Sequence, residues 1–220
     1  KKNSYNIGAT DPYFMDRPLS LSFDVYNEET ENTKGDVKSN SSGVGVSFGL
    51  KNNLWYQPFK YNYYSSESTT SSTSTANSIT GEEGLEIITS AITFRISQDT
   101  RDNYFNPKSG HSISFANTLS GFGGDSTFIK SVLKSKIFYP INYGDYTLGL
   151  KSGVGFINSL DDKITSSNRF RLGGKVLRGF DNTGVGPRDT GNNQVVGGNN
   201  FYNFSIELNS DEWMPADTGL

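Results

Sequence analysis

Short stretches in which apolar and polar residues alternate recur along the whole chain. Successive side chains of a β-strand point to opposite faces of its sheet, so this period of two predicts a strand wherever it persists. The predicted strands cover residues 5–9, 19–25, 44–50, 55–63, 88–96, 113–119, 128–139, 146–156 and 202–208. No stretch indicates a helix. We therefore predict an all-β chain of about nine antiparallel strands.

The residues opposite the apolar ones distinguish two kinds of all-β protein. A soluble β-sandwich usually covers its outer face with charged and long polar side chains, whereas this face carries mostly Gly, Ser, Thr and Asn, with scattered Lys, Arg and Glu. Only 33% of the residues are hydrophobic, and no apolar run approaches the roughly 18 residues of a membrane-spanning helix. A transmembrane β-barrel shares this composition, because only alternate residues of its strands face lipid. The small polar face favours the barrel.

Long and short connections alternate along the chain. Long polar connections are predicted at residues 27–42, 65–84, 121–126 and 159–198, and shorter ones at residues 11–18, 51–53, 99–110 and 140–145. Consecutive antiparallel strands place alternate connections on opposite edges of a sheet, so the long loops share one edge. Outer-membrane barrels show this asymmetry. It strengthens the prediction of a transmembrane barrel over a soluble sandwich.

Composition excludes several kinds of function. The chain has no cysteine and a single histidine, His111, so it cannot build a disulfide, a thiolate or histidine metal cluster, or a catalytic triad. Its formal net charge of −3 gives no basic face for nucleic acid. No phosphate-binding or calcium-binding motif occurs. We therefore expect no enzyme activity, no cofactor, no metal and no nucleic-acid partner.

The most unusual stretch of the chain covers residues 171–189. It is too rich in glycine for a regular helix, and its apolar residues do not alternate as in a strand. It is predicted to be a structured loop that presents one arginine and one aromatic residue, and on general grounds such a loop lies at the surface. Its marked residues are Gly173, Gly174, Arg178, Gly179, Phe180 and the Gly184-Val185-Gly186-Pro187 turn.

Strand parity offers an alternative place for this loop. Glu207 falls on the polar, inward face of the last predicted strand, and the strand before the loop lines the same interior with Gly149, Gly153 and Gly155. A loop that folds inward could lie over these glycines and bring Arg178 to Glu207. Away from bulk water, an arginine–carboxylate pair can be bidentate and geometrically specific. Our hypothesis is that an Arg178–Glu207 pair fixes the loop inside the barrel.

A second charged cluster, Asp99, Arg101 and Asp102, opens the short connection at residues 99–110. We interpret it as a structural turn on the periplasmic edge, in which Arg101 pairs with a neighbouring carboxylate. Pro107 and Gly110 stand where a turn needs them. Such a cluster could also suggest a functional site, but the structural turn is the favoured interpretation.

These motifs together resemble the BamA-type outer-membrane assembly factors, in the superfamily that includes the Sam and Toc translocon barrels. The resemblance covers essentially the whole chain. It rests on four motifs: the Gly173–Phe180 stretch with residues 182–187, Asp11-Pro12-Tyr13-Phe14, the Asp99-x-Arg101-Asp102 turn with Pro107 and Gly110, and Gly197-Gly198-Asn199 before Ser205-Ile206-Glu207.

The resemblance implies a barrel of roughly sixteen strands, preceded by POTRA domains. It implies insertion of β-barrel proteins into the bacterial outer membrane, where the first and last barrel strands part and template incoming strands by β-augmentation. The implied partners are outer-membrane lipid, nascent outer-membrane β-barrel proteins and periplasmic assembly lipoproteins. Arg178 and Glu207 stand where the family pairs its loop arginine with a lumenal acid. Residues 1–220 would then form a partial barrel domain without the POTRA region, the first strands or the last strands.

Two other functions stay open at this point. One is an outer-membrane secretion transporter of the same superfamily, of the two-partner secretion or TamA-like kind. The other is a passive porin or adhesin barrel, in which an Arg-Gly-Phe loop inside the lumen would have no purpose.

Overall fold

The computed structural model describes residues 2–32, 37–51, 55–70, 85–141, 146–161, 164–174, 176–181, 184–188 and 195–210. The predicted turn at Asn52-Asn53 lies outside the described residues, as do most of the polar connection at 65–84 and the strand expected to begin at Thr218.

Nine antiparallel strands form one sheet in the described part of the chain, in the order β1 to β9. The all-β prediction is therefore confirmed, and each predicted strand is present. The strands are β1 (Lys2–Asp11), β2 (Leu19–Asn32), β3 (Val37–Lys51), β4 (Tyr56–Thr70), β5 (Glu86–Asp99), β6 (Gly110–Ser120), β7 (Phe128–Ile141), β8 (Tyr146–Ser159) and β9 (Asn200–Ser210).

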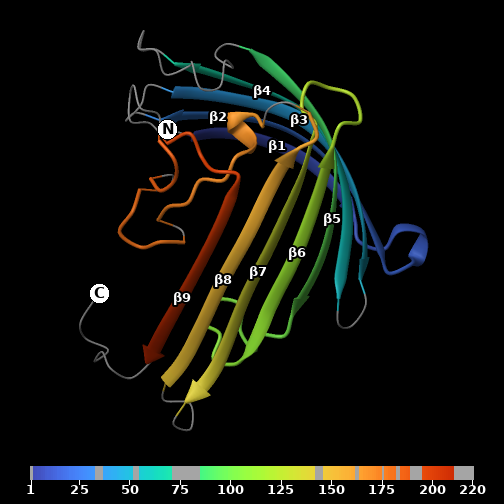
Figure 1. The fold of residues 1–220 in the computed structure, drawn as a ribbon. Coiled ribbons are helices and arrows are strands. Elements are labelled where there is room, and N and C mark those ends of the chain that lie inside the picture. Colours follow the sequence, from blue (N-terminus) through green and yellow to red (C-terminus); the bar gives the residue numbers. More distant parts are fainter. Residues whose placement is uncertain are drawn as a thin grey trace.

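The sheet is strongly curved, and β1 and β9 form its two edges (Figure 1). The segment between β8 and β9, drawn in orange in Figure 1, folds over the concave side of the sheet. Short 3-10 turns, η1 (Phe14–Asp16) and η4 (Ser166–Asn168), interrupt two connections. Within the described residues, no helix is long and apolar enough to cross a membrane.

The alternation of side chains explains the two faces of the sheet. In β9, Tyr202 is 87% exposed and Phe204 is 64% exposed on the convex face, while Glu207 lies on the other face. Pairing with β8 keeps this parity in register, because Leu150 stands opposite Ile206 and Gly149 opposite Glu207. The convex face is therefore an apolar surface that suits lipid, and the concave face is small and polar.

The prediction of a long loop at residues 27–42 is wrong. β2 and β3 continue pairing from Asn27–Ser42 to Asn32–Val37, which leaves only residues 33–36 between the strands. β4 likewise continues beyond the predicted residue 63, to Thr70. Polar residues can extend a strand once its neighbour supplies the backbone partners, since ladder hydrogen bonds do not require apolar side chains. The alternating hydropathy pattern identified only the apolar part of each strand, so it did not predict these polar extensions.

Pro58 disturbs β4 only locally. It stands opposite Gly49 in the pairing with β3. The pairing of β4 with β5 includes Tyr56–Ser97 and resumes at Phe59–Phe94 in the same register. Proline has no N–H to donate, so an interruption of the ladder at this point follows from its chemistry.

The inward glycines of β8 differ in what lies over them. A Cβ added at Gly155 would clash with the Phe201 ring and lie 3.0 Å from Phe170. A Cβ added at Gly149 would meet the Phe138 ring at 3.4 Å, an ordinary contact. Gly155 is therefore glycine because two aromatic rings occupy the space above it.

We predict that Gly155→Ala lowers barrel stability by about 1–3 kcal/mol, because it overpacks this aromatic contact. Gly149→Ala, on the same strand and face, is the matched control and should leave stability nearly unchanged. The temperature at which the folded band is lost in heat-modifiability electrophoresis measures both. Equal losses for the two variants would contradict the assignment.

Candidate functional site

The segment between β8 and β9 is held on the concave face first by apolar packing. Ile164, 6% exposed, joins Phe128 of β7 and Ile157 of β8 in a buried cluster, and Phe170 packs against it. Phe128 and Ile157 face inward on β7 and β8. They form an apolar seat for the segment, and burying three such side chains stabilises it by several kcal/mol on the scale of about 1.5–3 kcal/mol each.

Asn168 ties the same segment to two distant strands. Its side-chain oxygen accepts a hydrogen bond from Tyr64 Oη of β4 at 3.1 Å, and its carbonyl oxygen accepts one from Lys130 Nζ of β7 at 2.8 Å. Its amide nitrogen donates to Thr165 Oγ1 at 2.6 Å, which fixes the η4 turn. Lys130 Nζ also lies 4.6 Å from the centroid of the Phe170 ring. One buried asparagine thus links β4, β7 and the segment.

Phe170 brings the segment onto β8 and β9. Its ring meets Phe201 of β9 edge to face, with centroids 4.8 Å apart. The space for this pair is the one left by Gly155. The backbone of Phe170 also pairs with Gly198, just before β9 begins. The inner-face contacts of residues 164–170 therefore reach from β4 to β9.

The Arg-Gly-Phe tip is a compact turn that projects from this base. The carbonyl oxygen of Gly173 accepts hydrogen bonds from the amides of Val176 and Leu177, both at 2.8 Å. Gly179 has φ +89°, a conformation that strains other residues. Phe180 is 57% exposed. Asn182, Thr183 and Asp189 of the motif lie outside the described residues.

Arg178 approaches Glu207, as strand parity suggested, but not as a buried bidentate pair. Arg178 Nη2 lies 3.8 Å from Glu207 Oε1, and the Arg178 side chain is 87% exposed. The close partner of Glu207 is Lys151 of β8, whose Nζ donates to Oε2 at 2.6 Å. The carboxylate therefore has one oxygen on the barrel wall and the other toward the loop. The Arg178–Glu207 pair is therefore present as a long, exposed contact without the buried, bidentate geometry that we considered, and its role in fixing the loop stays a prediction.

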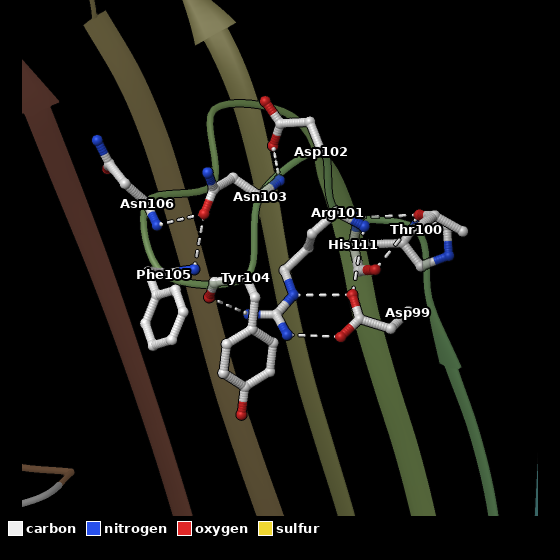
Figure 2. Close-up of polar contacts among 9 residues, drawn as sticks. All are labelled: Asp99, Thr100, Arg101, Asp102, Asn103, Tyr104, Phe105, Asn106 and His111. Atoms are coloured by element: carbon white, nitrogen blue, oxygen red, sulfur yellow. Dashed lines mark hydrogen bonds and ion pairs between the residues drawn. The ribbon is translucent and has the colours of Figure 1, made fainter.

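The turn after β5 is a separate, self-contained structure (Figure 2). Arg101 binds Asp99 through two parallel hydrogen bonds, Nε to Oδ1 at 2.8 Å and Nη2 to Oδ2 at 2.5 Å. The third guanidinium nitrogen of Arg101 donates to the Tyr104 carbonyl oxygen at 3.3 Å. The predicted pairing of Arg101 with a neighbouring carboxylate is present in this geometry, and Arg101 uses its fork to close the turn.

Asp102 organises the rest of this turn. Its Oδ1 accepts hydrogen bonds from the backbone amides of Asn103, Lys108 and Ser109 at 2.9, 3.0 and 3.1 Å. These donors, with the Ser109 amide contributing most, lower the pKa of Asp102 below its ordinary value. Gly110 closes the turn at φ +93°, where a Cβ would clash with the Thr100 carbonyl oxygen. In the described part of the chain, no group of three or more His, Asp or Glu residues is placed to hold a metal.

Sequence reasoning did not identify Lys130, Ile164, Asn168 and Phe170, which hold the segment, or Lys151, which holds Glu207. A signal existed for some of them. Ile157 is an apolar residue on the small, polar inner face of β8, and Lys130 and Lys151 are inward cations on adjacent strands. No sequence pattern marks Asn168, whose partners lie 104 and 38 residues away.

The curved antiparallel sheet, with its apolar convex face and its polar face covered by an inserted segment, defines the wall of a transmembrane β-barrel. Residues 1–217 match the Omp85 superfamily domain. The chain therefore belongs to the Omp85 superfamily, and its strands are part of an outer-membrane barrel.

Three relatives illustrate the match. The outer membrane protein assembly factor BamA of Neorickettsia risticii is 32% identical over 144 residues, covering 65% of this chain and 19% of that protein. A SAM50-like protein of Schizosaccharomyces pombe is 30% identical over 132 residues, covering 57% and 27%. BamA of Nitratidesulfovibrio vulgaris is 26% identical over 220 residues, covering 94% and 26%. The chain thus spans between 19% and 27% of the length of these relatives.

A solved structure shares the fold. The crystal structure of BamA from Haemophilus ducreyi lacking POTRA domains 1–3 superposes with a TM-score of 0.84 at 18% sequence identity. The match covers 94% of this chain and 44% of that chain.

Lys151 should matter more than Arg178 for stability. Lys151→Met removes the close, partly buried partner of Glu207 and should lower the free energy of unfolding by about 1–3 kcal/mol. Arg178→Met removes an exposed, longer contact, which is worth about 0–1 kcal/mol. Urea unfolding monitored by tryptophan fluorescence compares the two variants. A larger loss for Arg178→Met would contradict this ranking.

Asp102 should make the turn sensitive to acid. A carboxylate whose pKa is lowered by folding stabilises the turn above its ordinary pKa, and that contribution is lost as pH falls through the lowered value. Amide protection factors of residues 103–109, measured by hydrogen exchange, should therefore drop below about pH 4. Asp102→Ala should show low protection at every pH. Asp161→Asn, an exposed acid in another connection, is the control and should keep the drop. Protection in Asp102→Ala equal to that of the unaltered chain would refute this role.

Proposed function

We propose that this chain is a barrel segment of a bacterial outer-membrane assembly factor that folds and inserts β-barrel proteins. The observation that carries the proposal is the position of the β8–β9 segment, from which the Arg-Gly-Phe tip projects. It lies against the concave wall and contacts β4, β7, β8 and β9, where a passive pore would need an open lumen. Similarity to BamA proteins from two bacteria supports the same activity.

The segment acts in this proposal as an internal brace. Its contacts span six consecutive strands, from Tyr64 on β4 to Phe201 on β9. A brace of this reach keeps the curvature of one wall fixed while another part of a barrel moves. Arg178, at the exposed tip, adds a contact to Glu207 that can form and break without unseating the base.

We further propose that β1 and β9 pair with additional strands to complete a barrel of roughly sixteen strands, within the even-numbered range of bacterial outer-membrane barrels. The apolar convex face then meets outer-membrane lipid. Nascent β-barrel proteins are the substrates, and periplasmic lipoproteins are partners of POTRA domains elsewhere in the protein. No step in this proposal makes or breaks a covalent bond, so the protein is not an enzyme.

The decisive variants are Asn168→Ala and Arg178→Ala, placed in the protein as its cell makes it. Both should reduce the amount of folded β-barrel protein in the outer membrane after the unaltered protein is depleted. Phe122→Ala, in the connection between β6 and β7 on the same edge, is the control and should support normal assembly. The measurement is the heat-modifiable fraction of resident porins. Normal porin levels with impaired release of one secreted protein would indicate a secretion transporter and refute the proposal.

The variant Glu207→Gln tests the bracing role of the segment separately from the folding of the barrel. The loss of charge weakens both the Lys151 and the Arg178 contact but leaves the apolar seat intact. The segment should therefore become more sensitive to added protease while the barrel stays folded. Unchanged cleavage of residues 171–188 together with unchanged barrel stability would refute a role for the Glu207 contacts.

A further inference from the structure

A hollow of about 390 Å³ lies on the concave face below the seat of the β8–β9 segment. The hollow exists because small side chains line its floor. β6 turns the small side chains of Ser114, Ala116 and Thr118 inward, and these form the floor. Ala91 and Thr93 of β5 extend this floor. Longer side chains form the walls on either side: Asn62 and Tyr64 of β4 with Arg95 of β5, and Phe128, Lys130 and Lys134 of β7. Asn168 lines the hollow where it meets Tyr64 and Lys130.

The walls of this hollow carry uncompensated positive charge. Arg95 comes from β5, and Lys130 and Lys134 come from β7. None of the described residues lining the hollow is an Asp or Glu. Lys130 is engaged with Asn168 and Phe170. Arg95 and Lys134 have no carboxylate within ion-pair distance among the described residues, in contrast to Lys60 with Asp24 and Lys151 with Glu207 on the same face.

The hollow also contains an unsatisfied acceptor. Asn62 Oδ1 is buried at its β4 side and has no hydrogen-bond partner in the described part of the chain. A buried carbonyl oxygen without a donor is unfavourable, and a ligand N–H would satisfy it. The occupant that fits therefore brings anionic groups for Arg95 and Lys134 and an N–H donor for Asn62. A polypeptide with acidic side chains supplies both.

Position and size agree with this ligand. The hollow lies on the face opposite the apolar, lipid-facing one, so the headgroups of the surrounding lipid do not reach it. Its volume is within the 300–1,000 Å³ typical of ligand sites, enough for a few residues of an extended chain. The barrel is surrounded by lipid of low dielectric constant, which focuses the electric field of these cations inside the lumen. This field raises the local concentration of an anionic ligand.

We propose that this hollow binds an acidic, extended polypeptide segment of a partner protein, with Arg95 and Lys134 as the binding cations and Asn62 as the backbone acceptor. The proposal goes beyond the assembly function, and it can be tested by binding alone. Its failure would leave the bracing role untouched, because none of the variants below alters the seat of the β8–β9 segment.

The test uses the purified protein, as its cell makes it, in non-ionic detergent. The probe is an octapeptide of alternating Glu and Gly with an uncharged fluorophore, and its twin carries Gln in place of Glu. Fluorescence anisotropy should show binding of the Glu peptide only, weakening as salt rises. The double variant Arg95→Gln/Lys134→Gln should raise Kd at least tenfold. Lys136→Gln, one inward position along β7 and outside the hollow, removes an equivalent charge and should change Kd less than twofold.

A conservative variant, a folding check and competing ligands complete the test. Lys134→Arg should bind like the unaltered protein, and heat-modifiability checks that every variant is folded. Absence of Glu-peptide binding, equal binding of the Gln peptide, or an unchanged Kd in the double variant would overturn the proposal. Displacement of the peptide by inorganic phosphate or lipopolysaccharide at lower concentration than by unlabelled Glu peptide would also overturn it, in favour of a phosphate site.

Discussion

Backbone pairing is the constraint on which the rest of this structure depends. Inside a bilayer no water is available to the peptide groups, so each strand must find its partners in its neighbours. The nine strands satisfy this with antiparallel registers from β1 to β9, apart from the local interruption at Pro58. Once the registers are fixed, parity assigns every side chain to lipid or to the interior. The apolar convex face, the small polar concave face and the glycines of β8 all follow from that assignment.

Inside the barrel, specific contacts must then hold the long β8–β9 segment against a mostly polar wall. Packing and hydrogen bonding provide it here, more than the ion pair at the tip. Ile164 and Phe170 bury apolar surface on Phe128, Ile157 and Phe201, while Asn168 satisfies Tyr64 and Lys130. Arg178 stays exposed and shares Glu207 with Lys151. This separation lets the base of the segment remain seated while its tip exchanges contacts.

The strands, their faces and the turn at Asp99–Gly110 could be predicted from sequence, because they are local: alternation, turn residues and a carboxylate two residues from an arginine. The extensions of β2 to β4 could not, since polar strands outside the apolar band leave no hydropathy signal. Nor could the seat of the inner segment, because Asn168 meets partners that are distant in the chain and become adjacent only through sheet curvature. Strand parity did bring Arg178 near Glu207. It could not show that Lys151, inward on the neighbouring strand, would take the shorter contact.

The central claim is that the base of the β8–β9 segment sits against β8 and β9 inside the barrel. Photocrosslinking from position 170 tests it most directly, with benzoylphenylalanine in place of Phe170 in the protein as its cell makes it. Mass spectrometry of the digested photoproduct should join the peptide containing position 170 to peptides containing Gly155 or Phe201, because both lie at the Phe170 ring. A photoproduct formed only with external lipopolysaccharide, or only with other proteins at the cell surface, would contradict the account.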